Sequence, residues 1–111
     1  MPKEKIVIAG ASFFTEKYFV NPQFETTLPK KVLITIKEIC IRLSAILECA
    51  ITACFSSSGK VYFETIVDSG KELCDKKARA TIDNIIAEEI EFINGLELWY
   101  KIFILQQIGA Y

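Results

Sequence analysis

Two glycines stand where a phosphate-binding loop would place them. Gly10 follows the apolar run 6–9, but no second glycine and no amphipathic helix come after it, although a dinucleotide-binding loop needs both. Gly59 and Lys60 resemble the end of a P-loop, yet Val61 and a β-rich run follow where a Ser or Thr and a helix are required. The sequence therefore predicts that both glycines serve chain reversals and that neither binds a nucleotide.

Candidates for acid–base or nucleophilic chemistry are few. The chain contains no histidine, which removes the usual general base and the commonest zinc ligand. Glu88, Glu89 and Glu91 stand at helical contact spacing, but no histidine joins them in a di-metal motif. The serines at 56–58 fall in an expected hairpin tip and not in a nucleophile elbow. We predict no catalytic residue, no cofactor and no metal site, and we expect a protein that is not an enzyme.

The cysteines are typical of core thiols. Cys40, Cys49, Cys54 and Cys74 include no two pairs at metal-ligand spacing. In a reducing compartment such residues act as small apolar side chains more often than as disulfides. Together with the absence of a signal-peptide pattern at the start of the chain, they predict a cytoplasmic protein.

Charge and hydropathy exclude two classes of partner. Thirteen basic and 14 acidic residues give a formal net charge of −1, so no overall field attracts nucleic acid or an anionic membrane. No apolar run approaches the roughly 20 residues that span a bilayer. A basic stretch at 71–80 includes Lys76, Lys77 and Arg79 but no aromatic residue, which is typical of a solvated helix face. We expect neither a nucleic acid nor a membrane as partner.

Two pairs of β-rich runs predict hairpins. The first pair is 6–9 and 15–20, joined by a turn at 10–12, and the second is 49–55 and 60–68, joined by the loop 56–59. Apolar residues at three- and four-residue spacing then predict helices over 30–47 and 70–106. Thr27 is expected to cap the first helix, and Ser69 with Glu72 forms a capping box for the second. In the second, a break is expected at Asn94–Gly95 or at 79–81.

These elements predict one α+β domain spanning residues 1–111. The two β-hairpins form one antiparallel sheet with two helices packed on one face, in the order β-β-α-β-β-α. The arrangement resembles the general plan of profilin-like and roadblock-like modules, and this likeness of architecture carries no function.

Several segments of the chain resemble landmarks of one protein family. They are GASFFTEKYFVNPQF at 10–24, LP at 28–29, EIC at 38–40, SSSGKVYFE at 56–64 and LELWYKIFIL at 96–105. In this order they are similar to a family of small uncharacterised bacterial proteins, found mainly in clostridial-type Gram-positive genomes. The resemblance implies a bacterial cytosolic protein and supplies no activity.

Apolar residues outside the main helical stripes suggest contact with a partner. Ile34 and Ile41 lie seven residues apart and off the stripe, and Trp99 and Tyr100 belong to a segment that is apolar on most sides. These four residues form the candidate interaction surface of a non-enzymatic protein-interaction module. We expect it to use its aromatic and apolar C-terminal helix to form a homodimer or to bind another protein. The alternative is a small-ligand-binding protein or histidine-free enzyme, with a pocket between the N-terminal hairpin and the last helix.

Overall fold

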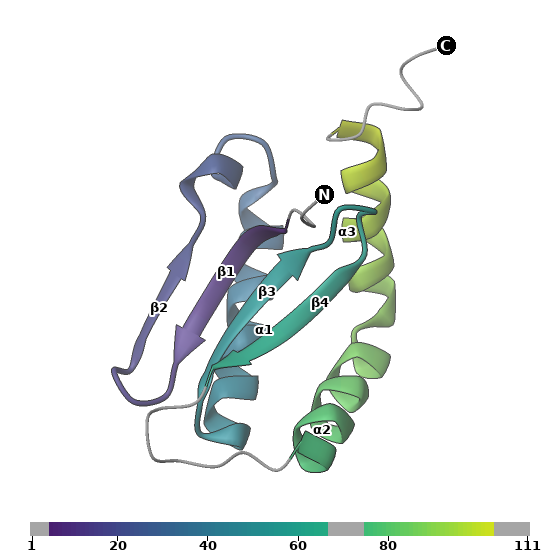
Figure 1. The fold of residues 1–111 in the computed structure, drawn as a ribbon. Coiled ribbons are helices and arrows are strands. Elements are labelled where there is room, and N and C mark those ends of the chain that lie inside the picture. The colour runs from purple at the N-terminus through teal and green to yellow at the C-terminus, as the bar shows by residue number, and fades with distance from the viewer. Residues whose placement is uncertain (1–4, 67–74, 104–111) are drawn as a thin grey trace.

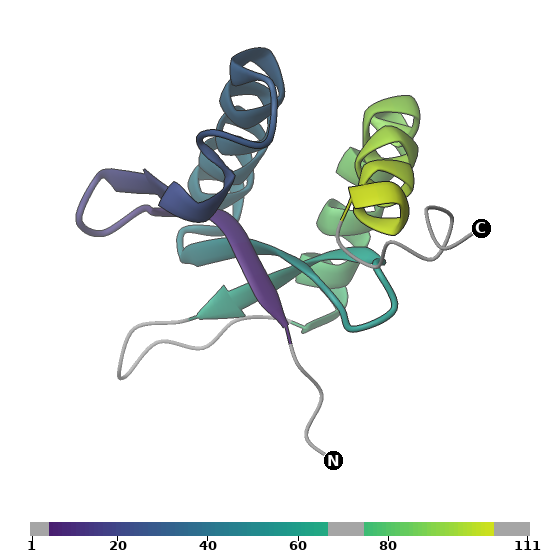
Figure 2. The same ribbon diagram turned by 90° about the horizontal axis from the view of Figure 1, so that it is seen from above.

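A computed structural model describes residues 5–66 and 75–103. The elements in chain order are β1 (Ile6–Ser12), β2 (Lys17–Val20), the 3₁₀ helix η1 (Pro22–Phe24), α1 (Lys30–Leu47), β3 (Ala50–Phe55), β4 (Val61–Ile66), α2 (Asp75–Glu88) and α3 (Ile90–Phe103). The strands form one antiparallel sheet in the order β2-β1-β3-β4, and the helices rise from the same face of it (Figures 1 and 2). The predicted α+β class and the order β-β-α-β-β-α are confirmed, with the second helical segment divided in two.

The first hairpin forms as predicted, but its turn lies further along the chain. Ser12 pairs with Lys17, so the turn comprises residues 13–16, and Glu16 adopts a left-handed conformation with φ of 56°. The predicted turn at 10–12 is therefore wrong. Gly10 lies within β1 and pairs with Phe19, whose ring covers it: a Cβ at Gly10 would lie 2.5 Å from Phe19 Cε1. A glycine held between two strands in this way cannot form a phosphate loop.

The register of the sheet separates a covered face from an open one. Directly paired residues share a face, so Ala11, Ile51 and Thr65 point toward the helices. Their chain neighbours, such as Thr52 and Glu64, point to the opposite, open face. The small side chains of β1 and β3 on the covered face let α1 pack closely across these two strands.

Helix α1 follows the predicted stripe and ends as expected near Leu47. Its buried residues are Leu33, Ile36, Ile39, Cys40, Leu43, Ser44 and Leu47. The predicted cap is wrong, because Thr27 Oγ1 donates to the carbonyl of Gln23 and Pro29 takes the N-cap position without a side-chain bond. The helix ends at Glu48 in a left-handed conformation with φ of 55°, which turns the chain into β3.

The bend between α2 and α3 falls at Glu89, and not at Asn94–Gly95 or 79–81. A Cβ at Gly95 would meet nothing within 4 Å, so this exposed glycine stays helical at a cost of about 1 kcal/mol. Glu89 instead interrupts the apolar stripe with a charge, which pairs with Arg42 of α1 at 3.3 Å. Its N–H contacts the carbonyls of both Ile85 and Ile86, as in a tightened helical turn. The predicted capping box at 69–72 lies outside the described residues.

Candidate functional site

The structure divides the four residues of the predicted interaction surface between two environments. Ile34 and Ile41 lie on the outer side of α1 and are 41% and 38% exposed. Trp99 is half-buried, with its ring against Phe24 at a centroid distance of 5.8 Å. Tyr100 is only 4% exposed and belongs to the core, so it is not part of an exposed surface of this chain.

Tyr100 is buried because the second hairpin provides a place for its ring. The ring lies 4.7 Å from that of Phe55 at the end of β3, measured between centroids. Its other neighbour is Gly59, where a Cβ would lie 2.6 Å from Tyr100 Cδ1 and where φ is +89°. The glycine of the hairpin loop thus lets α3 pack against β3 and β4. The sequence could have indicated the burial of Tyr100 only if the contact between the loop 56–59 and α3 had been known.

An apolar groove lies between the first hairpin and α1. We name it the hairpin–α1 groove; its volume is about 610 Å³. The hairpin contributes Phe13, Phe14 and Tyr18, and α1 contributes Ile41, Ser44 and Ala45. Among the predicted residues, Ile41 lines the groove directly, and Ile34 lies two helical turns before it on the same side of α1.

Local structure positions the aromatic wall of this groove. The turn 13–16 places two phenylalanines next to each other, with their rings edge to face at 5.7 Å. Tyr18 follows on β2, and the ammonium group of Lys37 lies 4.4 Å from the centre of its ring. This cation–π contact fixes the ring beside α1 and leaves the side chain 57% exposed. The sequence indicates the aromatic residues, but not that α1 lies beside them.

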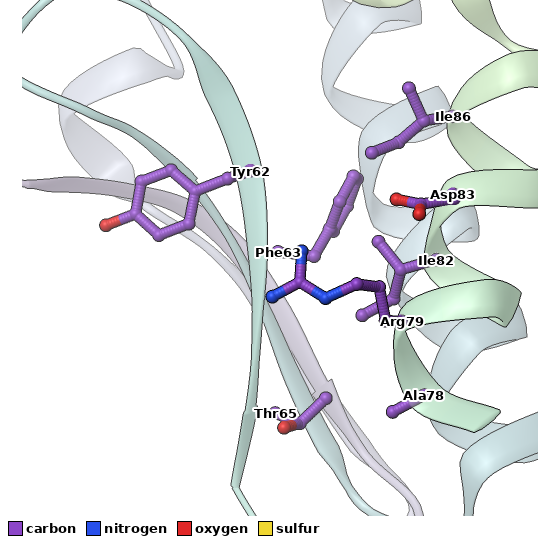
Figure 3. A pocket seen from close by; sticks show the side chains of 8 residues that line it. All are labelled: Tyr62, Phe63, Thr65, Ala78, Arg79, Ile82, Asp83 and Ile86. Carbon is purple, nitrogen blue, oxygen red and sulfur yellow. The ribbon is translucent and has the colours of Figure 1, made fainter. Parts of the chain in front are cut away.

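A second, more polar cavity lies at the other edge of the sheet, between β4 and α2. We name it the β4–α2 cleft; its volume is about 350 Å³. Figure 3 shows Phe63 and Arg79 entering the space between strand and helix, while Tyr62 points away on the far side of β4. Because residues from both faces of β4 line it, the cleft lies at the edge of the strand.

The backbone of β4 is open along this cleft. Val61 directs its N–H away from β3, to Glu97 Oε2 at 2.9 Å. Because the backbone N–H and C=O groups of successive residues point alternately to the two sides of a strand, Tyr62 and Glu64 bond to β3. Phe63 and Thr65 therefore also direct their N–H and C=O groups outward. Among residues 5–66 and 75–103, no group bonds to these four backbone atoms.

The three described cysteines are buried, Cys40 and Cys49 in the core and Cys54 beside Thr52 on the opposite face of the sheet. Burial raises the pKa of Cys40 to about 12, and burial is also the main cause that raises the pKa of Cys49 and Cys54. All three are neutral near pH 7, whereas a nucleophilic cysteine needs an accessible thiolate. Within the described ranges, no three cysteine or acidic side chains come together as metal ligands. Cys74 lies outside those ranges.

Comparison with known proteins identifies a family. The model of a family of unknown function, DUF6145, matches residues 5–108. The chain belongs to DUF6145. No curated protein and no solved structure gave a significant match. The resemblance to an uncharacterised family is thus confirmed. None of the described helices has the length and apolar content needed to cross a bilayer.

Proposed function

We propose that this DUF6145 protein is a non-enzymatic protein-interaction module that forms a homodimer through the hairpin–α1 groove and the adjoining edge of β2. One observation carries the proposal: large apolar side chains from two elements are exposed side by side. They are Phe13, Phe14, Tyr18, Ile34 and Ile41, each about 40% exposed or more. A cluster of this kind on one side of a protein is typical of an interaction surface.

The energy available from this surface supports a weak dimer. Full burial of a large apolar side chain contributes about 1.5–3 kcal/mol, and these five are already half-buried, so each adds about 1 kcal/mol. A two-fold interface uses every residue twice, which gives about 10 kcal/mol. This matches the cost of association, about 4–15 kcal/mol. Strand pairing along β2 then supplies the net free energy that favours the dimer.

The edge of β2 offers that pairing to a second copy. The N–H of Asn21 bonds to the carbonyl of Ile8 at 2.8 Å, so by alternation Tyr18 and Val20 direct their backbone groups away from β1. An antiparallel copy of β2 bonds to the same groups in a two-fold arrangement. The two α1 helices would then lie on the same face of a continuous sheet, with Phe13, Phe14 and Tyr18 of both hairpins between them.

Sedimentation velocity at about 1–100 μM tests the dimer. We expect the parent chain to sediment as a dimer, and Ile41→Asp as a folded monomer, because each copy would bury the new carboxylate. Leu98→Asp is the matched control: Leu98 is 55% exposed on α3, away from the groove. A parent chain that stays monomeric, or equal behaviour of the two variants, would refute the proposal.

A small apolar ligand in the same groove is the second candidate function. The volume of about 610 Å³ falls within the range of ligand pockets, about 300–1,000 Å³. The groove is lined by the hairpin and α1, whereas the sequence placed the pocket beside the last helix. Thermal-shift screening with apolar metabolites tests this function. Stabilisation of the parent chain but not of Ile41→Asp would support it, and no stabilisation by any compound would exclude it for the metabolites tested.

We also propose that the protein works in a bacterial cytoplasm. Free buried thiols at Cys40, Cys49 and Cys54 suit a reducing compartment. Fractionation of source cells tests the location, and recovery outside the cytoplasm would contradict it.

A further inference from the structure

We propose that the β4–α2 cleft binds an extended acidic segment of another protein, which adds to β4 as a fifth strand. This site is at the opposite edge of the sheet from β2 and shares no residue with the proposed homodimer interface (Figure 1). Three features carry it: the open backbone of β4, the space beside it, and the positive charge of Arg79, which pairs with no carboxylate of residues 5–66 and 75–103.

The open backbone provides the pairing groups. Phe63 and Thr65 present two N–H and two C=O groups outward, enough to bond an extended segment in the antiparallel or parallel sense. At the loop end of β4, the carboxylate of Glu97 already occupies the N–H of Val61 at 2.9 Å. The carboxylate limits the added strand to the part of β4 beyond Val61. It also shows that an acidic oxygen satisfies a backbone group of this edge.

The cleft provides room for the side chains of the added strand. Helix α2 lies beside β4 without close packing, and the small side chain of Ala78 stands opposite Thr65 (Figure 3). Phe63, Ile82 and Ile86 make an apolar lining on the helix side. Since side chains alternate along a strand, every second residue of a bound segment enters this lining, and apolar residues there are favoured.

The charge of the cleft selects acidic segments. Arg79 reaches from α2 toward β4, and among the described residues no carboxylate pairs with it (Figure 3). Asp83 lies one turn further along α2 and does not form an ion pair with Arg79. Lys76 and Lys77 are exposed in the same part of the helix, so the three basic side chains outweigh Asp75 and Asp83 and give this part of α2 a net charge of +1. A guanidinium group binds a carboxylate through two parallel hydrogen bonds, and an acidic side chain of the segment supplies one.

The test uses fluorescein-labelled octapeptides of alternating valine and threonine that carry either two glutamates or two lysines at the same positions. Fluorescence anisotropy at low salt measures their dissociation constants. We expect the acidic peptide to bind at least tenfold more tightly than the basic one. Arg79→Glu should abolish or reverse this preference, while Lys31→Glu, with the same charge change on the exposed start of α1, should leave it in place.

Two further measurements separate strand addition from simple charge attraction. Thr65→Pro removes an outward N–H at a sheet edge that tolerates proline, and it should weaken binding of the acidic peptide at least fivefold. In the parent chain, the peptide should slow the hydrogen exchange of the Phe63 and Thr65 amides. Equal binding of both peptides, unchanged binding by Arg79→Glu, or protection confined to other strands would each overturn the proposal. Loss of dimers in Arg79→Glu but not in Ile41→Asp would show a second copy as the occupant and would also overturn it.

Discussion

Replacing Gly59 by alanine should destabilise the protein, although the same change at Gly95 should stabilise it. Gly59 has φ of +89°, a conformation that side chains rarely adopt, and its Cβ would lie 2.6 Å from Tyr100 Cδ1. Gly95 is helical, and a Cβ there would meet nothing within 4 Å. The two substitutions add the same methyl group, so they form a matched pair within one chain.

The expected free energies follow from these two environments. A non-glycine residue at positive φ costs about 1–2 kcal/mol, and overpacking of the Tyr100 ring adds about 1–3 kcal/mol. Gly59→Ala should therefore lower the free energy of unfolding by about 3 kcal/mol, a large part of the roughly 5–15 kcal/mol of an ordinary domain. Gly95→Ala should raise it by up to about 1 kcal/mol, because glycine is a poor helix former.

Urea unfolding followed by the fluorescence of the single tryptophan, Trp99, measures both changes. All variants are compared at one protein concentration, because dimer formation would add to the apparent stability. In a Tyr100→Leu background, the ring that a Cβ at position 59 would meet is absent. There Gly59→Ala should lower the free energy of unfolding by only about 1–2 kcal/mol, from backbone strain alone. If Gly59→Ala leaves the parent stability unchanged, α3 does not pack on the β3–β4 loop as described.

Two further predictions concern buried groups. Because burial raises the pKa of Cys40 to about 12 from the ordinary 9.0, the unfolded chain releases a proton that the folded chain retains between about pH 9 and 12. The stability that this thiol contributes is complete below pH 9 and then falls by up to about 1.4 kcal/mol per pH unit. Cys40→Ala should therefore weaken the fall of the free energy of unfolding with pH above pH 9, measured by urea unfolding. An equal fall in the parent chain and the variant would contradict this. Glu97→Ala should cost about 1–3 kcal/mol in urea unfolding because it leaves the N–H of Val61 without an acceptor. Glu97→Gln, which keeps an acceptor oxygen, should cost less, and equal costs would show that this bond does not hold α3 to β4.

The elements that depend on local pattern were predictable from the sequence. The second hairpin appears at 50–55 and 61–66 because the polar loop 56–59 separates two β-rich runs. Helix α1 ends at Leu47 because its apolar stripe stops there. Errors arose where a distant residue decides the local structure. In the sequence Gly10 resembles a turn residue, but in the structure it lies in β1 beneath the ring of Phe19. The bend falls at Glu89, which pairs with Arg42, 47 residues away.

The candidate sites were predictable only as residue types. Exposure separates Ile34 and Ile41 from Tyr100, but all three lie on helices with apolar residues on several faces. The pattern of one helix cannot show whether a ring meets a partner or its own sheet. The β4–α2 cleft was missed because Arg79 fitted a solvated helix face. Its position beside an open strand follows from the way α2 is placed along β4, which no short segment of sequence encodes.

The two edges of the sheet suggest how the proposed interactions combine. β2 and β4 are the outermost strands, so a homodimer joined through β2 places its two β4–α2 clefts at opposite ends of a continuous sheet. The chemistry of the edges prevents their exchange: β2 bears exposed aromatic residues and pairs with an equal strand, whereas the Arg79 side of β4 favours a carboxylate. A strand such as β2, which carries Lys17 and no acidic residue, has no group to neutralise Arg79. This difference disfavours open-ended chains of subunits and favours a closed dimer with two separate sites, in which two linked segments of one partner would bind more tightly than either alone.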